Sequence, residues 1–349
     1  MTDSTSANVV VVPCKYKTGR VLGQGTYATV KEAVHIETGE RFAVKVLNKK
    51  LMAGREQLIR NEITVLKRIS LGHPNVLSLR DYFETQNNLY LVMDLASGGE
   101  LLDRICQKGS YYEMDAARLV YTITDVVAYL HRNDIVHRDL KPENLLFRTQ
   151  DEDSELLVAD FGLSRIVERE KFHLLTTTCG TPGYMAPEIF LKKGYGAEVD
   201  MWAIGVITYF LLCGYTPFDR DTNAEEIQAI IRAEYSFEPK EYWADISDEA
   251  KSFIRSTLMI DPQQRLSAAD ALHHPWLRAA KEAVEKGTKM GEAPPMLSPA
   301  GSDSNLLPSV KKNFNARRTL RKAIDMVRLV NKLTQEYGVV DEHVVGAAE

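Results

Sequence analysis

The sequence predicts an α+β fold of two lobes, a small β-rich lobe followed by a larger helical one. Residues 16–95 alternate apolar and polar side chains around turn signals such as Glu37-Thr38-Gly39-Glu40, a pattern typical of strands. One helical pattern interrupts them at about residues 55–70. From about residue 100 to residue 277 long helical patterns dominate, among them MDAARLVYTITDVVAYLH and VDMWAIGVITYFLLCG.

The composition is that of an ordinary globular protein and argues against several classes. The chain has 349 residues, of which 44% are apolar and 26% charged, and its net charge of −5 argues against a nucleic-acid partner. The four cysteines have no disulfide or metal-ligand spacing, so we expect a cytoplasmic location, with the nucleus as a second one. The most apolar stretch, Met201 to Tyr215, is shorter than the roughly 20 residues of a membrane span, which predicts a buried core helix.

The first strand pattern carries Gly23-Gln24-Gly25, where glycines let a backbone approach a polyphosphate closely and donate its N–H groups. Glycines at this spacing also open dinucleotide-binding units, but in those units a helix follows. Here a second strand pattern, ATVKEAVHI, follows instead. The pattern therefore predicts a hairpin that covers phosphate groups.

Lys45 lies among apolar residues in the next strand pattern, FAVKV, where an ammonium group is costly to bury without an anion. In the helical pattern that follows, Glu62 falls near the middle of the apolar sector at 100° per residue. An inward lysine and an inward carboxylate predict a buried ion pair that positions Lys45 for phosphate groups. The alternative is a surface glutamate on a helix of different phase.

The sequence HRDLKPEN has the highest density of chemically active side chains. Asp139 can accept the proton of an incoming hydroxyl group, and Lys141 can neutralise charge on a phosphate during transfer. Asn144 can hold a magnesium ion together with Asp160, which ends a short strand pattern and is followed by Phe161-Gly162. The ordered set of glycine loop, lysine, glutamate, HRDLKPEN and DFG predicts phosphate transfer.

This ordered set resembles the motifs of the eukaryotic protein kinases over residues 16–277. The resemblance implies a bilobal protein kinase fold with an N-lobe over 16–95 and a C-lobe over 96–277. It implies ATP and Mg2+ as cofactors, with Asn144 and Asp160 as the metal ligands. The residues implied to line the ATP site are Leu22, Gly23, Gly25, Val30, Ala43, Lys45, Glu62, Met93, Asp94, Leu95 and Leu146.

Two further pairs of motifs agree with the resemblance. In kinases Glu188 of the sequence APE would form an ion pair with Arg265, and Asp200 would brace the loop of the catalytic Asp139. One residue departs from the pattern, because Ala28 stands where the third glycine of the loop is expected. This leaves open how tightly the glycine hairpin closes.

The resemblance also implies the acceptor. Lys141 in HRDLKPEN and Thr181 in GTPGY are typical of the serine/threonine branch, which phosphorylates short aliphatic hydroxyl groups. A pseudokinase, which is a folded scaffold without turnover, is the remote alternative. The acidic Glu100 and Glu143 are positions that basic-directed kinases use to bind arginines upstream of the acceptor. We therefore expect arginine-containing protein substrates.

Arg138 implies a switch, because in kinases of this kind it pairs with a phosphorylated residue between DFG and APE. The candidates are three consecutive threonines, Thr176 to Thr178. By its spacing to CGTP, Thr177 matches the activation threonine of calcium/calmodulin-dependent kinases, which implies an upstream activating kinase. The alternative is that these are ordinary loop threonines.

The C-terminal part carries a basic amphipathic pattern. We predict a linker over 278–310, a basic helical segment over 311–335 and a tail over 336–349. Residues 311–333 contain eight basic residues and one acidic residue, Asp325, which departs from a purely basic pattern. Large apolar residues occur at relative positions 1, 5 and 10 or 1 and 14, as in calmodulin targets. The anchors of these two registers are Leu320, Ile324, Leu329 and Leu333.

The basic segment resembles the regulatory region of calcium/calmodulin-dependent kinases. The resemblance implies autoinhibition that Ca2+/calmodulin relieves, so truncation near residue 300 is expected to give calmodulin-independent activity. Membrane binding and a merely solvated extension are the alternatives. Because about 15 residues follow the segment, too few for an association domain, we expect a monomer.

Overall fold

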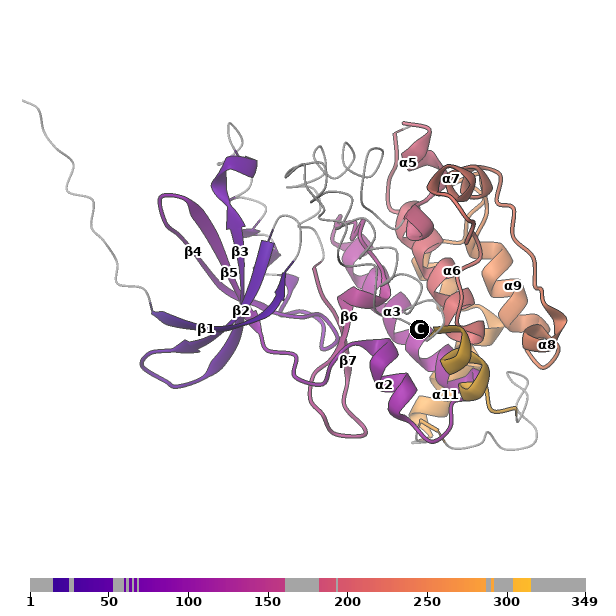
Figure 1. The fold of residues 1–349 in the computed structure, drawn as a ribbon, viewed down its shortest axis with the longest axis horizontal. Helices are drawn as coiled ribbons and strands as arrows, with labels where there is room; N and C mark the ends of the chain where they lie inside the picture. The colour runs from indigo at the N-terminus through magenta and orange to yellow at the C-terminus, as the bar shows by residue number, and fades with distance from the viewer. Residues whose placement is uncertain are drawn as a thin grey trace, which may run out of the picture.

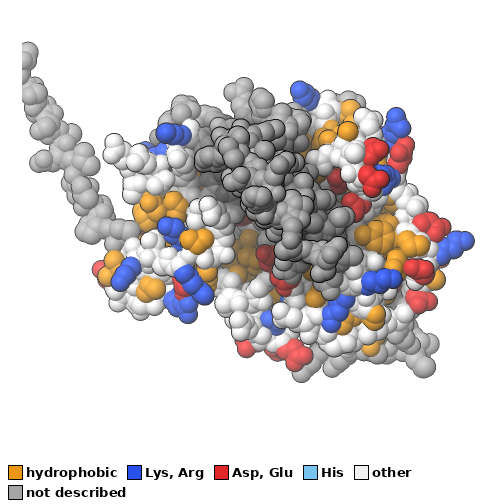
Figure 2. Space-filling view, in the orientation of Figure 1, with side chains coloured by type: hydrophobic (Ala, Val, Ile, Leu, Met, Phe, Trp, Pro, Cys, Tyr) orange, Lys and Arg blue, Asp and Glu red, His pale blue; other side chains and the backbone are white. Residues whose placement is uncertain are grey.

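The computed structural model describes most of the region from residue 15 to residue 314. The described residues are 15–24, 28–52, 60, 63–64, 66–67, 69–160, 182–192, 194–286, 290–291 and 304–314. The other residues are drawn in grey in Figure 1 and in the space-filling view of Figure 2. Figure 1 shows a twisted sheet on one side and a group of helices on the other, so the predicted bilobal α+β fold is confirmed.

The N-lobe is a five-stranded antiparallel sheet with the strand order β1-β2-β3-β5-β4. One face of this sheet holds a small core in which Val44 and Val92 are fully buried. The opposite face contributes Leu91 and Met93 to the main core of the molecule. The strands are β1 (Tyr16–Gln24), β2 (Ala28–His35), β3 (Arg41–Asn48), β4 (Leu79–Glu84) and β5 (Asn88–Asp94), and a 3-10 turn, η1 (Lys49–Met52), follows β3.

The C-lobe is helical, with a two-stranded sheet of β6 (Leu145–Phe147) and β7 (Leu156–Val158) beside the N-lobe. Its longer helices are amphipathic or fully buried, and the short turns carry Pro at their first positions. The helices are α2 (Leu101–Gln107), α3 (Glu113–Arg132), α5 (Pro187–Phe190), α6 (Glu198–Cys213), α7 (Asn223–Ile231), α8 (Lys240–Trp243), α9 (Asp248–Thr257), α10 (Ala268–Ala271) and α11 (Pro275–Glu285), with 3-10 turns η2 (Pro142–Asn144) and η3 (Pro182–Tyr184).

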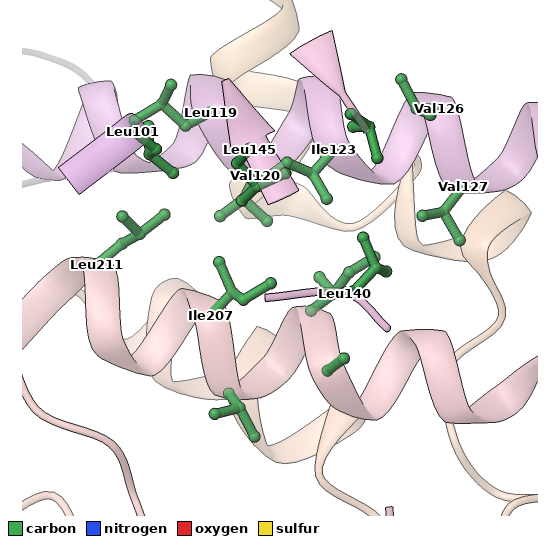
Figure 3. Close-up of a cluster of buried hydrophobic side chains, with 14 of the residues drawn as sticks. Leu101, Leu119, Val120, Ile123, Val126, Val127, Leu140, Leu145, Ile207 and Leu211 are labelled. Carbon is green, nitrogen blue, oxygen red and sulfur yellow. The ribbon is translucent and has the colours of Figure 1, made fainter. Parts of the chain in front are cut away.

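Helix α6 forms the centre of the C-lobe. It is apolar on every side and buried along nearly its whole length, so the prediction of a core helix here is confirmed. Ile207 and Leu211 of α6 face Val120 and Ile123 of α3 in Figure 3. Within the described part of the chain, no helix combines the length and hydropathy that crossing a bilayer requires.

The prediction of a linker over 278–310 is wrong at both of its described ends. Helix α11 continues to Glu285, and residues 304–314 pack on the C-lobe, where they form the yellow helical turns in Figure 1. Leu306, Leu307 and Val310 are buried in the main core. Composition misled the prediction, because three apolar side chains at helical spacing within a Gly-, Pro- and Ser-rich stretch are enough to dock it.

The contact of this segment with α6 is close. Gly214 ends α6 in the left-handed region at φ 85°, and a Cβ added there would lie 2.8 Å from the carbonyl oxygen of Val310. Only glycine adopts a positive φ without strain and also has no Cβ to collide with Val310. The side chain of Asn313 donates a hydrogen bond to the carbonyl oxygen of Cys213 at 2.8 Å, which satisfies one of the last carbonyl groups of the helix.

Candidate active site

The loop between α3 and β6 gathers three of the predicted residues. The Nζ of Lys141 lies 3.0 Å from Oδ2 of Asp139. The Nδ2 of Asn144 donates to the backbone oxygen of Asp139 at 2.7 Å. This hydrogen bond commits the amino end of the Asn144 side chain to the loop, so its amide oxygen is the end available as a metal ligand.

Asp200, at the start of α6, holds this loop in place. Its carboxylate accepts the backbone N–H groups of His137 at 2.8 Å and of Arg138 at 2.7 Å. It also lies 2.8 Å from Nε2 of His131. Arg138 has φ 67°, a conformation that non-glycine residues adopt only when their surroundings enforce it. The predicted bracing role of Asp200 is therefore confirmed.

His137 joins the loop to the strand before Asp160, and the sequence analysis assigned it no role. It is fully buried, and its Nε2 lies 2.9 Å from the carbonyl oxygen of Ala159. Burial lowers the pKa of His137, against the charges of Asp200 and Asp139, so the ring is neutral. A neutral ring with its proton on Nε2 donates to Ala159 and can accept from the backbone N–H of Asp139 at 3.3 Å through Nδ1.

Asp160 lies across from this loop. The backbone N–H of Ala159 donates to the carbonyl oxygen of Asn144 at 2.9 Å, which brings the two predicted metal ligands together. Asp160 itself has φ 62°, a second strained residue at this site. Its Oδ2 lies 2.7 Å from Nζ of Lys45, and these side chains are 30% and 15% exposed. The carboxylate and the ammonium group therefore form a partly buried ion pair between the lobes.

Lys45 comes from the middle of β3. Val30 lies directly opposite it on β2, and Ala43, two residues earlier on β3, lies opposite Met93 on β5. Side chains that are paired or two residues apart share one face of a sheet. Because Lys45 reaches Asp160, this is the face that the N-lobe turns toward the catalytic loop.

The remaining described residues of the predicted ATP site lie on β1, at the end of β5 and on β6. Leu22 and Gly23 lie on β1, and Asp94 and Leu95 lie where the chain leaves the N-lobe. Leu146 lies on β6, where its backbone pairs with Glu100. The predicted nucleotide-lining residues that the structure describes therefore come from both lobes.

The two predicted substrate-binding acids are exposed and lie on neighbouring elements. Glu100 precedes α2, and its backbone forms a bridge to Leu146. Glu143 lies in η2, three residues before Leu146. Both residues therefore lie near Leu146, one through a backbone bridge and the other along the chain.

Arg265 and Glu188 form the ion pair that the resemblance implied. Nη1 and Nη2 of Arg265 lie 2.7 and 3.1 Å from the two carboxylate oxygens of Glu188, and both side chains are buried. The guanidinium group also lies over the ring of Trp202, 5.2 Å from its centroid, and donates to backbone oxygens of Met259 and Glu198. The pair therefore joins the segment of Glu188 to α6 and to the loop that follows α9.

Several predicted residues lie outside the described part of the chain. The ion pair of Lys45 with Glu62 stays a prediction, as do the roles of Thr177 and of the basic segment. The predicted residues not described are Gly25, Glu62, Thr177, Thr181, Leu320, Ile324, Leu329 and Leu333.

The family comparison agrees with the fold and with this cleft. The protein kinase domain family matches residues 16–277, which is most of the chain. A two-lobed fold with Asp139, Asn144 and Asp160 between the lobes defines a protein kinase. Kinase domains of this family use ATP and a divalent metal. The carboxylate of Asp160 and the amide oxygen of Asn144 fit such a metal, because Mg2+ prefers oxygen ligands and completes its shell with phosphate oxygens and water.

Relatives narrow the class further. The chain is 60% identical over 330 residues, 95% of its length, to the calcium/calmodulin-dependent protein kinase cmkB of Emericella nidulans, of which the match covers 78%. It is 56% identical over 92% of its length to the calcium/calmodulin-dependent protein kinase type I of Schizosaccharomyces pombe, covering 90% of that protein. It is 48% identical over 75% of its length to rat type 1B, covering 75% of that kinase. The chain thus belongs to the calcium/calmodulin-dependent serine/threonine protein kinase family.

Proposed function

We propose that this kinase transfers the terminal phosphate of Mg-ATP to serine or threonine in arginine-containing protein substrates, under the control of Ca2+/calmodulin and of loop phosphorylation. The observation that carries the catalytic part is that two groups of side chains are joined through the backbone. Asp139, Lys141 and Asn144 contact one another in one loop. The N–H of Ala159 donates to the carbonyl oxygen of Asn144 and so ties this loop to the next residue, Asp160, which pairs with Lys45. A donor nucleotide and an acceptor hydroxyl group fit between such groups.

Each side chain has a role that its contacts support. Asp139 orients the acceptor hydroxyl and takes its proton, and its neighbour Lys141, 3.0 Å away, stabilises negative charge on the phosphate in transfer. Lys45 orients the phosphates of the nucleotide. Asn144 and Asp160 would hold Mg2+, which would neutralise charge on the phosphates. The hydrogen bonds that Asp200 accepts from the backbone of His137 and Arg138 keep the loop of Asp139 in position during the reaction.

Glu100 and Glu143 support the arginine preference of the proposal. Both are exposed, and an arginine guanidinium group binds carboxylates through charge-assisted hydrogen bonds. Removing one such contact costs about 1.5–3 kcal/mol, or roughly tenfold to a hundredfold in affinity.

Two observations support control by calmodulin and by phosphorylation. The names of three relatives state dependence on calcium and calmodulin, and the basic pattern over 311–333 suits the acidic surface of calmodulin. Arg138 lies in the strained loop next to Asp139, where a phosphate on Thr177 would pair with it and order the loop. A basic segment that binds a membrane or another partner is the alternative.

The experiment is phosphate transfer from Mg-ATP to an arginine-containing serine peptide, with and without Ca2+/calmodulin, after treatment with an activating kinase. We expect transfer to rise at least tenfold when Ca2+/calmodulin is present. A Thr177→Ala variant is expected to lose the response to the activating kinase while keeping the response to calmodulin. Equal rates with and without calmodulin would contradict the regulatory part, and no transfer in any condition would contradict the catalytic part.

A further inference from the structure

Strand β4 carries one extra residue beside the end of β5. Leu79 is paired with Met93 and Asp81 with Val92, so Arg80 is the extra residue of a β-bulge. A bulge turns the side chain of its extra residue in a new direction. Here the guanidinium group of Arg80 meets the carboxylate of Asp94: its Nε donates to Oδ1, and its Nη2 donates to Oδ2 at 3.0 Å.

The backbone on both sides of this contact is fixed as well. The N–H of Asp94 donates to the carbonyl oxygen of Ser78 at 3.1 Å. Ser70, which is fully buried, accepts through its hydroxyl oxygen from the N–H of Leu79 at 3.0 Å, and its carbonyl oxygen accepts from the hydroxyl of Ser78 at 3.1 Å. The residues that precede the bulge are therefore buried and held by hydrogen bonds.

The same segment reaches the metal-binding side of the cleft. The N–H of Leu77 donates to the carbonyl oxygen of Val158 at 3.0 Å. The N–H of Val158 in turn donates to the carbonyl oxygen of Asn75 at 2.8 Å. Val158 ends β7, two residues before Asp160. Residues 75–80 thus hold hydrogen bonds at one end to the strand of Asp160 and at the other end to Asp94.

We propose that Arg80 is a positioning residue for the nucleotide, which holds Asp94 so that the backbone leaving the N-lobe presents its polar groups to the adenine ring. This rests on the proposed function, because Asp94 and Leu95 belong to the ATP site only by the resemblance to kinases. Arg80 acts through Asp94 and does not touch the nucleotide. Its side chain is 46% exposed and that of Asp94 is 17% exposed, so the pair contributes modestly to stability. Its bidentate geometry fixes direction as well as distance.

The test compares Arg80→Gln with wild type in the full chain, by titration with Mg-ADP and with adenosine. Because the contact acts at the adenine end, we expect both dissociation constants to rise by the same factor, about threefold to tenfold. The KM for ATP is expected to rise likewise while kcat stays within about twofold. Arg80→Lys keeps the charge but not the bidentate contact. Its dissociation constants are expected to lie between those of wild type and those of Arg80→Gln.

Arg60→Gln is the matched control, because Arg60 makes a bidentate pair with Glu84 at the other end of β4, at 2.7 and 2.9 Å and with similar exposure. Adenosine affinity is expected to be unchanged in this control, and the melting temperatures of the two variants are expected to agree. An unchanged adenosine affinity in Arg80→Gln would overturn the proposal, as would an equal loss in Arg60→Gln. A wild-type chain that bound no adenine nucleotide would instead contradict the proposed function itself.

Discussion

The carboxylate of Asp200 lies 2.7 Å from the backbone nitrogen of Arg138, a residue 62 positions away whose φ is 67°. A second hydrogen bond of 2.8 Å reaches the neighbouring nitrogen of His137. In this geometry each of the two carboxylate oxygens accepts one of the N–H groups. The relationship explains how a strained loop is held rigid under the catalytic side chains.

Asp200→Asn is therefore expected to impair catalysis more than binding. The amide has one acceptor oxygen, so one buried N–H group faces an amino group, at a cost of about 1.5–3 kcal/mol. We expect kcat to fall roughly tenfold to a hundredfold, while the KM for ATP changes little. Steady-state kinetics, with a melting curve to confirm folding, checks this. A variant with the wild-type kcat would show that the loop keeps its shape without the charge.

The buried ion pair of Arg265 and Glu188 predicts strong coupling. Arg265→Met leaves the Glu188 carboxylate buried without its partner and is expected to lower the free energy of unfolding by about 3–5 kcal/mol. Glu188→Leu is expected to cost a similar amount. In the double variant no buried charge is left unpaired. Its loss of unfolding free energy is therefore expected to be well below the sum of the losses of the two single variants. Urea unfolding of the four proteins measures this, and additive losses would contradict it.

His274 predicts a pH dependence of stability. It precedes α11, and its Nδ1 accepts the N–H of Trp276 at 3.3 Å. Burial lowers the pKa of His274, while the Glu249 carboxylate acts in the opposite direction. Between the lowered pKa and the unfolded value of about 6.5, the unfolded chain binds a proton that the folded chain does not. The contribution of His274 to stability is therefore complete above about pH 6.5 and is lost as the pH falls.

His274→Asn is the variant for this prediction, because asparagine caps a helix without titrating. The fall in the free energy of unfolding between pH 7.5 and 5.5, measured by urea unfolding, is expected to be smaller in the variant than in wild type. Parallel pH profiles for the two proteins would exclude a contribution from His274.

Much of the active site could be predicted from the sequence because local patterns carry it. Asp139, Asn144 and Asp160 follow one another at fixed spacing, and Lys45 lies in a strand whose apolar neighbours make its position unusual. The contact of Glu188 with Arg265 was implied by the resemblance, since residues 77 positions apart give no local signal. His137 stands first in HRDLKPEN, two residues before the catalytic Asp139. This short spacing is the sequence signal that could have predicted its structural role.

Other features depend on register and docking, which local patterns do not determine. The bulge that turns Arg80 toward Asp94 is fixed by the pairing of β4 with β5. Leu306 docks on the C-lobe through its N–H, which donates to the carbonyl oxygen of Tyr111 at 2.8 Å. The turn-forming residues on both sides of Leu306 hid this contact.

This docking changes the expected outcome of truncation. A chain that ends at residue 303 loses the buried Leu306, Leu307 and Val310, each of which contributes about 1.5–3 kcal/mol before the cost of ordering the segment. A chain that ends at 314 keeps them and lacks the basic segment. We expect calmodulin-independent activity from the chain that ends at residue 314. The chain that ends at residue 303 is expected to have a melting temperature several degrees lower. Equal melting temperatures would show that residues 304–314 add nothing to the fold.

Under the proposed function, Asp160 holds the metal-bound nucleotide, whereas Asp139 acts on the acceptor hydroxyl group. Calorimetric titration of Mg-ATP into Asp160→Asn and Asp139→Asn separates these two roles. We expect the affinity of Asp160→Asn to fall at least tenfold and that of Asp139→Asn to stay within about twofold of wild type. Wild-type affinity in Asp160→Asn, or an equal loss in both variants, would contradict the assignment of the two carboxylates.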